Sequence, residues 1–296
     1  MSNDILHGVI IPVITPLDDN EAVDEGAFRA QIDRLINAGV HGLFIGGSAG
    51  EGPVLREQEW QRMIEIASNA TAGRVPLLGG VIETSLSRGL EKLKRLQQLD
   101  YQYFVVTPTF YLANSGASEH MRLFEACWRE RGDMEMIAYN IPGCVGSSIS
   151  VDTFIELAEK GWIRHCKESS GDTELLAQLI PRGNAVGLRT LVGDERLIPL
   201  GLFAGGHGFI PVCGNAVPEV CVDLYNATIA GDGKLAAQHH AKLIEARHAM
   251  IIEGTCWLSG IKYAVSKQGI GNGRISPPLD PPSIRQKELI DKILGL

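Results

Sequence analysis

The stretch GVIIPVITP, from Gly8 to Pro16, is apolar along almost its whole length. A strand with one face in water alternates apolar and polar residues, whereas a parallel strand buried on both faces is apolar throughout. Seven further short runs follow, most of them also continuously apolar. They are GLFIG (42–46), VPLLGGV (75–81), YFVVTP (103–108), MEMIAYNIP (134–142), IRHCKES (163–169), GLRTLVGD (187–194) and GHGFIPV (206–212). Together the eight runs predict a buried, mostly parallel sheet.

The segments between these runs carry helical spacing. Phe28, Ile32 and Leu35 fall at i, i+4 and i+7, and Leu86 and Leu93 repeat this spacing later in the chain. Such spacing places apolar side chains on one face of a helix. Eight strands alternating with helices predict an α/β fold, a (β/α)8 TIM barrel. A doubly wound sheet is the competing architecture, but no dinucleotide-binding fingerprint favours it.

The pattern changes after the eighth run. Residues 218–269 read as helices, and ISPPLDPPS (275–283) predicts a rigid loop before a last amphipathic helix over 284–294. We therefore expect a barrel that forms the catalytic core over residues 1–217. C-terminal helices over 218–296 would comprise the last barrel helix and an extension.

Charge and composition exclude several classes of protein. The 296-residue chain has 27 basic and 35 acidic side chains and a formal charge of −8, whereas a nucleic-acid-binding protein would show a basic stripe. No run is long enough to span a membrane, and no signal peptide is recognisable. Six scattered cysteines are typical of a reduced protein, and no histidine pair has metal-ligand spacing. We expect a soluble cytoplasmic protein without nucleic-acid, membrane or metal partners.

Lys167 stands at the end of a predicted strand, in IRHCKESSGD (163–172). The carboxyl ends of barrel strands carry the chemistry in this architecture. A lysine held there in a cleft could lose its proton and attack a carbonyl. If Lys167 and Tyr139 both point inward from neighbouring strands, they would meet. The alternatives are a solvent-facing lysine and a core tyrosine, and the residues alone leave them open.

The turn GGSAGE, from Gly46 to Glu51, has two interpretations. Its first five residues fit G-x-S-x-G, which in an α/β-hydrolase places a nucleophilic serine on a strand-to-helix elbow. Pro53 argues against this, because it would fall inside the helix that should begin after Ser48. The other interpretation is a turn whose exposed backbone N–H groups bind an anion such as a carboxylate.

The motifs GVIIPVITPL, GGSAGE, VVTPTF, YNIP, KESSGD, VGDE and GGHGFIPVCGN, in this order, resemble the dihydrodipicolinate synthase / N-acetylneuraminate lyase family. The resemblance extends from about Gly8 to the C-terminal helices. It implies a TIM barrel with a helical extension, assembled as a homotetramer that is a dimer of dimers. It also implies that pyruvate, or a 2-oxo acid that yields it, forms an imine on Lys167, with no other cofactor.

The resemblance assigns further roles in the same pocket. Tyr139 would transfer protons, and Ser48 would position it. The backbone N–H groups of Ser48 and Ala49 would hold the carboxylate of pyruvate. Gly193 and Ile210 match positions that line the pocket.

Three departures from the family pattern bear on the substrate. Ala49 replaces the second hydroxyl residue of the turn, and Phe110 stands where the synthases carry a relay tyrosine, with Tyr111 next to it. Cys144 replaces an arginine that binds the carboxylate of aspartate semialdehyde in the synthases, and a thiol cannot substitute for it. In addition, the segment GCVGSS (143–148) places two serines near the expected mouth. These features favour a 2-keto-3-deoxy sugar acid, cleaved to pyruvate and an aldehyde.

Three other functions stay open. The chain could be a 4-hydroxy-tetrahydrodipicolinate synthase after all, or a keto-deoxy sugar acid dehydratase that uses the same lysine. It could also be a catalytically silent binder of pyruvate or an amino acid. The presence of both Lys167 and Tyr139 favours an enzyme. For the tetramer, we expect the region 105–118 to form a pairing surface.

Overall fold

The computed structural model describes residues 6–112, 116–252 and 256–295. Eight parallel strands close into a barrel in sequential order, and β1 pairs with β8. The strands are β1 (Gly8–Pro12), β2 (Gly42–Ile45), β3 (Leu77–Val81), β4 (Tyr103–Val106), β5 (Glu135–Asn140), β6 (His165–Glu168), β7 (Arg189–Val192) and β8 (Gly208–Phe209). The predicted (β/α)8 TIM barrel is confirmed.

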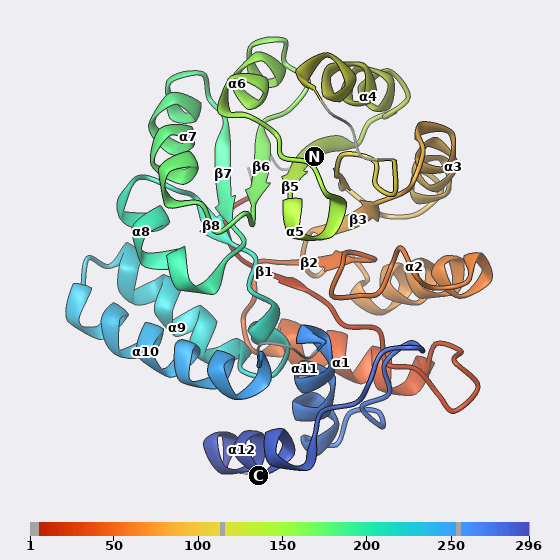
Figure 1. Cartoon of the computed structure of the whole chain (residues 1–296), viewed down its shortest axis with the longest axis vertical. Coiled ribbons are helices and arrows are strands. Elements are labelled where there is room, and N and C mark those ends of the chain that lie inside the picture. Colours follow the sequence, from red (N-terminus) through yellow and green to blue (C-terminus); the bar gives the residue numbers. More distant parts are fainter. Residues whose placement is uncertain (1–5, 113–115, 253–255, 296) are drawn as a thin grey trace.

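Helices cover the outside of the barrel (Figure 1). Those between strands are α1 (Glu25–Asn37), α2 (Glu57–Thr71), α3 (Leu86–Leu96), α4 (Ala117–Arg129), α5 (Pro142–Val145), α6 (Val151–Glu159), α7 (Thr173–Ala185) and α8 (Ile198–Phe203). After β8 come α9 (Pro218–Ile229), α10 (Gly233–Met250), α11 (Trp257–Lys267) and α12 (Ile284–Leu294). In Figure 1 the last three lie together beside α1 and α9, as the predicted C-terminal extension. The exact division at residue 217 stays a prediction.

Each predicted run contains a strand, but the strands are shorter than the runs. β1 ends at Pro12 although the apolar run continues to Pro16, and β8 covers only Gly208 and Phe209. Residues past the end of β1, such as Val13 and Ile14, are still fully buried. An apolar run therefore indicates which residues are buried. Where a strand ends depends instead on the hydrogen bonds between backbones, and proline cannot donate one.

The buried side chains form two layers, one inside the barrel and one between the barrel and the helices. Along β1, Ile10 points inward while Val9 and Ile11 point outward to the helices, as the alternation of a strand requires. Tyr139 belongs to the inner layer. The inner layer comprises Leu6, Ile10, Phe44, Leu78, Ile82, Tyr103, Val105, Ile137, Tyr139, Leu191 and Ile210.

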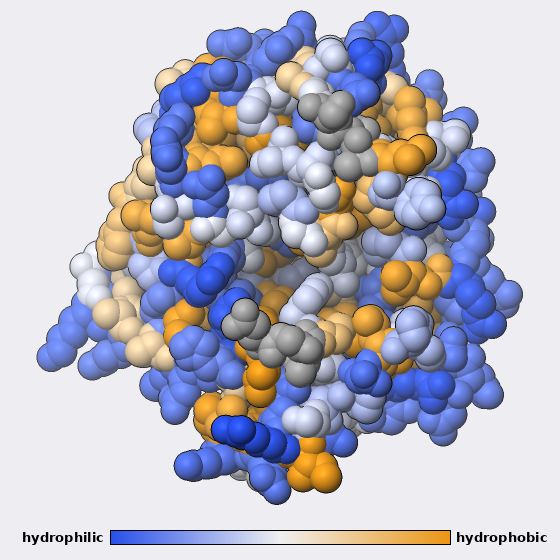
Figure 2. Space-filling view, viewed as in Figure 1, coloured by the Kyte–Doolittle hydropathy of each residue, from blue (hydrophilic) through white to orange (hydrophobic). Residues whose placement is uncertain are grey.

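In Figure 2 polar residues cover much of the edge, and hydrophobic residues lie in several patches, some of them beside a hollow near the middle. Within the described ranges, no helix has the length and apolar character needed to cross a bilayer.

Candidate active site

Lys167 lies inside the barrel, next to Tyr139. Strand pairing sets Lys167 of β6 opposite Tyr139 of β5, and the Lys167 Nζ lies 4.1 Å from the centre of the tyrosine ring. Only 4% of Lys167 is exposed. The expected meeting of the two side chains is therefore confirmed, and a solvent-facing lysine is excluded.

The surroundings of Lys167 favour its neutral amine. Burial lowers the pKa of Lys167 to about 7, and the negative charge of Glu195 only partly opposes this effect. At neutral pH a large fraction of the side chain is thus unprotonated and nucleophilic. Lys262 is a useful contrast, because this buried lysine forms an ion pair with Glu51. Burial lowers the pKa of Lys262 as well, but the Glu51 carboxylate opposes this effect and binds the amine directly.

Tyr139 is 98% buried, and burial raises the pKa of its hydroxyl, while the nearby hydroxyls of Ser169 and Ser48 act in the opposite direction. The phenol is therefore protonated at neutral pH and starts as a proton donor. The Ser169 hydroxyl oxygen is buried and has no hydrogen bond of normal geometry to a described residue. It lines the same cavity and lies near the Tyr139 hydroxyl.

The turn after β2 brings Ser48 and Ala49 to this cavity. No helix begins there, because α2 starts only at Glu57, so the turn is not a nucleophile elbow. Neither backbone N–H of Ser48 and Ala49 donates to a described residue, which leaves both available to an anion. The turn folds tightly on itself, since a Cβ on Gly52 would lie 1.9 Å from the carbonyl oxygen of Gly46.

These residues enclose a cavity of about 160 Å³ at the carboxyl ends of the strands. It is lined by Pro12, Ser48, Ala49, Tyr139, Ile141, Cys144, Lys167, Ser169, Gly193, Ile210, Val212 and Trp257. Every predicted site residue except Phe110 thus lines this reactive cavity. The geometry shows that they meet, and their roles stay predictions.

Phe110 lines an adjoining outer chamber of about 250 Å³. Ser48, Cys144 and Trp257 line both spaces, so the two are neighbours. Tyr111 faces away into solvent with 91% of its surface exposed. Within one chain it is therefore Phe110, and not Tyr111, that contributes to the site.

Five residues that line the reactive cavity were not among the predicted site residues: Pro12, Ile141, Ser169, Val212 and Trp257. Ser169 stands two positions after Lys167, and alternation along the strand could have placed it on the same side. It also packs against Gly193, where a Cβ would lie 1.8 Å from the serine hydroxyl. Val212 and Trp257 come from the segments after β8, and no local pattern identifies them.

A polar network holds the ends of β5 and β6 in place. The Asn140 amide donates to Glu168 Oε2 at 2.7 Å, and Glu168 Oε1 accepts from the backbone N–H of Ser170 at 2.5 Å. Asn140 Oδ1 in turn accepts from the backbone N–H of Ile149 at 2.9 Å. Because Asn140 and Glu168 directly follow Tyr139 and Lys167, this network positions the two reactive side chains.

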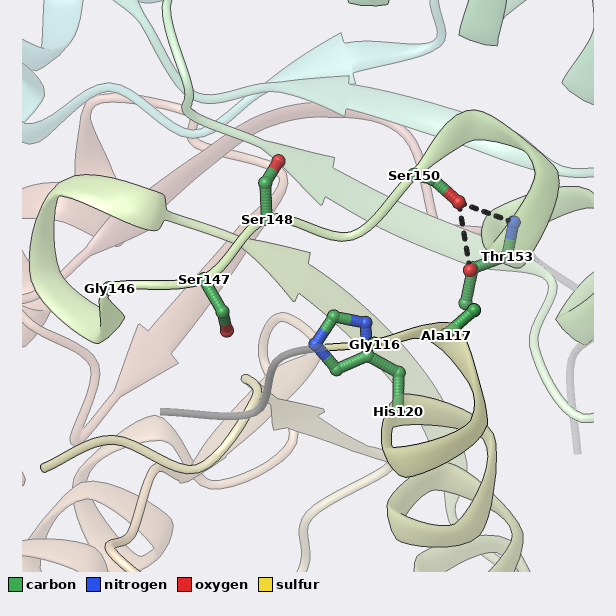
Figure 3. A pocket seen from close by; sticks show the side chains of 8 residues that line it. All are labelled: Gly116, Ala117, His120, Gly146, Ser147, Ser148, Ser150 and Thr153. Carbon is green, nitrogen blue, oxygen red and sulfur yellow. Dashed lines mark hydrogen bonds between the residues drawn. The ribbon is translucent and has the colours of Figure 1, made fainter. Parts of the chain in front are cut away.

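Ser147 and Ser148 do not lie at the mouth, and this part of the sequence analysis was wrong. Both line a separate cavity of about 390 Å³ between α4 and α6. In Figure 3 Ser147 points toward His120, while Ser148 points away from it. The hydroxyl of Ser148 donates to Asn140 Oδ1 at 3.4 Å. The loop after α5 thus directs both hydroxyls away from the reactive cavity.

No group of three histidine, cysteine, aspartate or glutamate side chains within the described residues is placed to hold a metal ion.

Comparison with known proteins gives consistent matches. The model of the dihydrodipicolinate synthetase family matches residues 5–295. A 4-hydroxy-tetrahydrodipicolinate synthase from Bartonella bacilliformis is 30% identical over 98% of this chain and 97% of its own. An uncharacterised DapA-like lyase from Halobacterium salinarum is 30% identical over 93% of this chain and 88% of its own.

A solved structure is also similar. It is that of a prophage protein of the dihydrodipicolinic acid synthase family from E. coli K12, in complex with pyruvate. That protein is 27% identical, with a TM-score of 0.91 over 99% of this chain and 100% of the other.

Proposed function

Because the chain belongs to the dihydrodipicolinate synthetase family of pyruvate-dependent class I aldolases and lyases, we propose that it cleaves a longer 2-oxo acid to pyruvate and an aldehyde. One observation carries the proposal for this chain. A buried lysine, Lys167, has a pKa lowered to about 7 by burial and lies against the ring of Tyr139 in a small cavity. The related prophage protein was solved in complex with pyruvate, which supports a 2-oxo acid as the ligand of this cavity.

The first step is formation of an imine. The neutral Lys167 amine attacks the C2 carbonyl of the substrate, and a carbinolamine forms. Tyr139 donates its proton to the departing hydroxyl, which leaves as water. The iminium cation on Lys167 and the resulting phenolate of Tyr139 then lie side by side, and the cation stabilises the phenolate. The free N–H groups of Ser48 and Ala49 would hold the carboxylate.

The second step breaks the C3–C4 bond. The Tyr139 phenolate takes the proton of the C4 hydroxyl, the bonding electrons move into the iminium, and an aldehyde and an enamine result. Tyr139 returns its proton to C3 of the enamine, which gives the iminium of pyruvate on Lys167. Water hydrolyses this species, so pyruvate and the free amine are released.

The part of the site that would contact the aldehyde argues against condensation of pyruvate with aspartate semialdehyde. That reaction needs a cation for a second carboxylate, and losing such a charge-assisted contact costs about 1.5–3 kcal/mol. Cys144 stands at the junction of the two cavities, and desolvation raises the pKa of its thiol although part of the residue is exposed, so it offers neither charge nor a strong donor. A 2-keto-3-deoxy sugar acid has no second charge and remains compatible, but it loses the support of Ser147 and Ser148.

Trapping with borohydride tests the lysine. Incubation with pyruvate and borohydride should leave a reduced pyruvyl adduct on the peptide that contains Lys167. Lys262 is an internal control, because it is equally buried but paired with Glu51. Label on Lys262, or no label at all, would refute the mechanism. A trapped adduct without turnover on any 2-oxo acid would instead support the silent binder.

Two further proposals follow from family membership. We propose that the protein assembles as a homotetramer, a dimer of dimers, and that it acts in the cytoplasm. A dehydratase remains the alternative activity, and it is distinguished by its product, since it would release water from the 2-oxo acid without releasing pyruvate.

A further inference from the structure

We propose that the aldehyde released by this enzyme carries an apolar group, such as an aryl or branched alkyl chain, which the outer chamber binds. The inference rests on the proposed lyase function and names its substrate class. It starts from the position of the chamber, which adjoins the reactive cavity along Ser48, Cys144 and Trp257. A substrate bound through C2 to Lys167 fills the reactive cavity with its carboxylate and first carbons. Its C4 substituent therefore has to extend toward the chamber.

The walls of the chamber are predominantly apolar. Ile82, Val145 and Leu258 are buried in its wall, and the rings of Phe110 and Trp257 also face it. A volume of about 250 Å³ accommodates a phenyl ring or a chain of similar size. Contact with such walls stabilises an apolar group in proportion to the area removed from water.

The described residues that line the chamber offer no free charge to a ligand. Glu51 lines it, but its Oε1 is paired with Lys262 and its Oε2 accepts from the Ser276 backbone N–H at 2.8 Å. Lys167 is the one basic side chain among the described residues that line either space.

Hydroxyl groups of a sugar chain would also lack partners. Ser48 is the one hydroxyl residue among the described residues of the chamber wall, and it already faces Tyr139. Ser147 and Ser148 line the other cavity (Figure 3). A polyol that enters the chamber exchanges its hydrogen bonds with water for apolar contacts, and each unsatisfied group weakens binding. An apolar substituent has no such loss.

Two substrates with the same reacting atoms separate these possibilities. Pyruvate release from 4-hydroxy-2-oxo-4-phenylbutanoate should show a kcat/KM at least about tenfold above that from 2-keto-3-deoxygluconate, since apolar contacts of one pocket commonly discriminate by tenfold or more. Equal or faster cleavage of the sugar acid, or no cleavage of the phenyl compound, would overturn the inference. Trapping of pyruvate on Lys167 is measured in parallel. An adduct there leaves the lyase mechanism intact even if the inference fails.

A variant at the rim tests the chamber itself. Leu279 lines it and is 44% exposed, so Leu279→Asn should fold. We expect the variant to lower kcat/KM for the phenyl substrate several-fold, with unchanged pyruvate trapping. Leu289→Asn is the matched control, because Leu289 on α12 is 36% exposed and lines neither space. Unchanged cleavage of the phenyl substrate by a folded Leu279→Asn variant would contradict the proposed binding site.

Discussion

At the scale of single residues, the pKa of Lys167 predicts how imine formation depends on pH. Because burial holds the pKa at about 7, the ammonium form dominates below this pH and the nucleophilic amine above it. The initial rate of pyruvate trapping with cyanoborohydride should rise about tenfold per pH unit below pH 7 and level off above it. A rate that still climbs steeply at pH 9 would mean an ordinary lysine.

Tyr139→Phe separates binding from proton transfer. The variant keeps the ring beside Lys167 but loses the hydroxyl, so kcat for pyruvate release should fall by about 10²–10⁴. Slow trapping of pyruvate should persist, because Lys167 and the N–H groups of the turn remain. Turnover near that of the unchanged enzyme would mean that Tyr139 is a core residue that takes no part in proton transfer.

Sequence could predict the encounter of these two residues but not the directions of the nearby loops. Alternation along β5 and β6 forces Tyr139 and Lys167 to the same side once the barrel is assumed. The orientation of Ser147 and Ser148 depends instead on the backbone after α5 and on the bond from Ser148 to Asn140. No periodicity encodes such a loop, and the expected polar mouth was therefore wrong.

At the scale of elements, a buried ion pair links the turn after β2 to α11. Glu51 and Lys262 are each about 97–98% buried. Removing one partner of such a pair leaves an uncompensated charge and typically costs about 3–5 kcal/mol. Lys262→Met should thus lower the free energy of unfolding by this amount in urea titrations.

The double variant Glu51→Gln/Lys262→Met is the control. Glutamine keeps an acceptor for the Ser276 N–H but carries no charge, so most of the lost stability should return. If the double variant is as unstable as Lys262→Met alone, the loss comes from packing and not from the stranded carboxylate. The pair matters to the site because Glu51 closes the turn that presents Ser48 and Ala49.

The number and order of the strands and their alternation with helices were predictable, because burial on both faces leaves a strong apolar signal in each strand. The ends of the strands were not, since Val13 and Ile14 are as buried as β1 itself without belonging to it. Trp257 and Leu279 reach the site from segments that are distant in sequence. Only the path of the C-terminal extension brings them there.

At the scale of the whole molecule, several large apolar side chains of the described residues are exposed. Val54, Tyr111 and Leu112 are 62%, 91% and 81% exposed, and they mark a first candidate contact surface. Phe203 at the end of α8 and Ile229 at the end of α9 are 67% and 66% exposed, and they mark a second candidate. In Figure 1, α8 and α9 lie on the opposite side of the barrel from α2, which follows Val54. A dimer of dimers requires two distinct contact surfaces on each chain.

We therefore expect each surface to bind a second copy of the chain. Residues 113–115 of the predicted pairing region lie outside the described residues, but Tyr111 and Leu112 belong to this region and are described.

Sedimentation velocity at micromolar concentration should show a tetramer. Leu112→Asp and Phe203→Asp should each reduce it to a dimer, because a charge buried in an apolar contact is strongly unfavourable. Ile284→Asp on α12, at a site 78% exposed, should leave the tetramer intact. A monomeric unchanged protein would refute the assembly, and tetramers in both surface variants would mean that other surfaces pair.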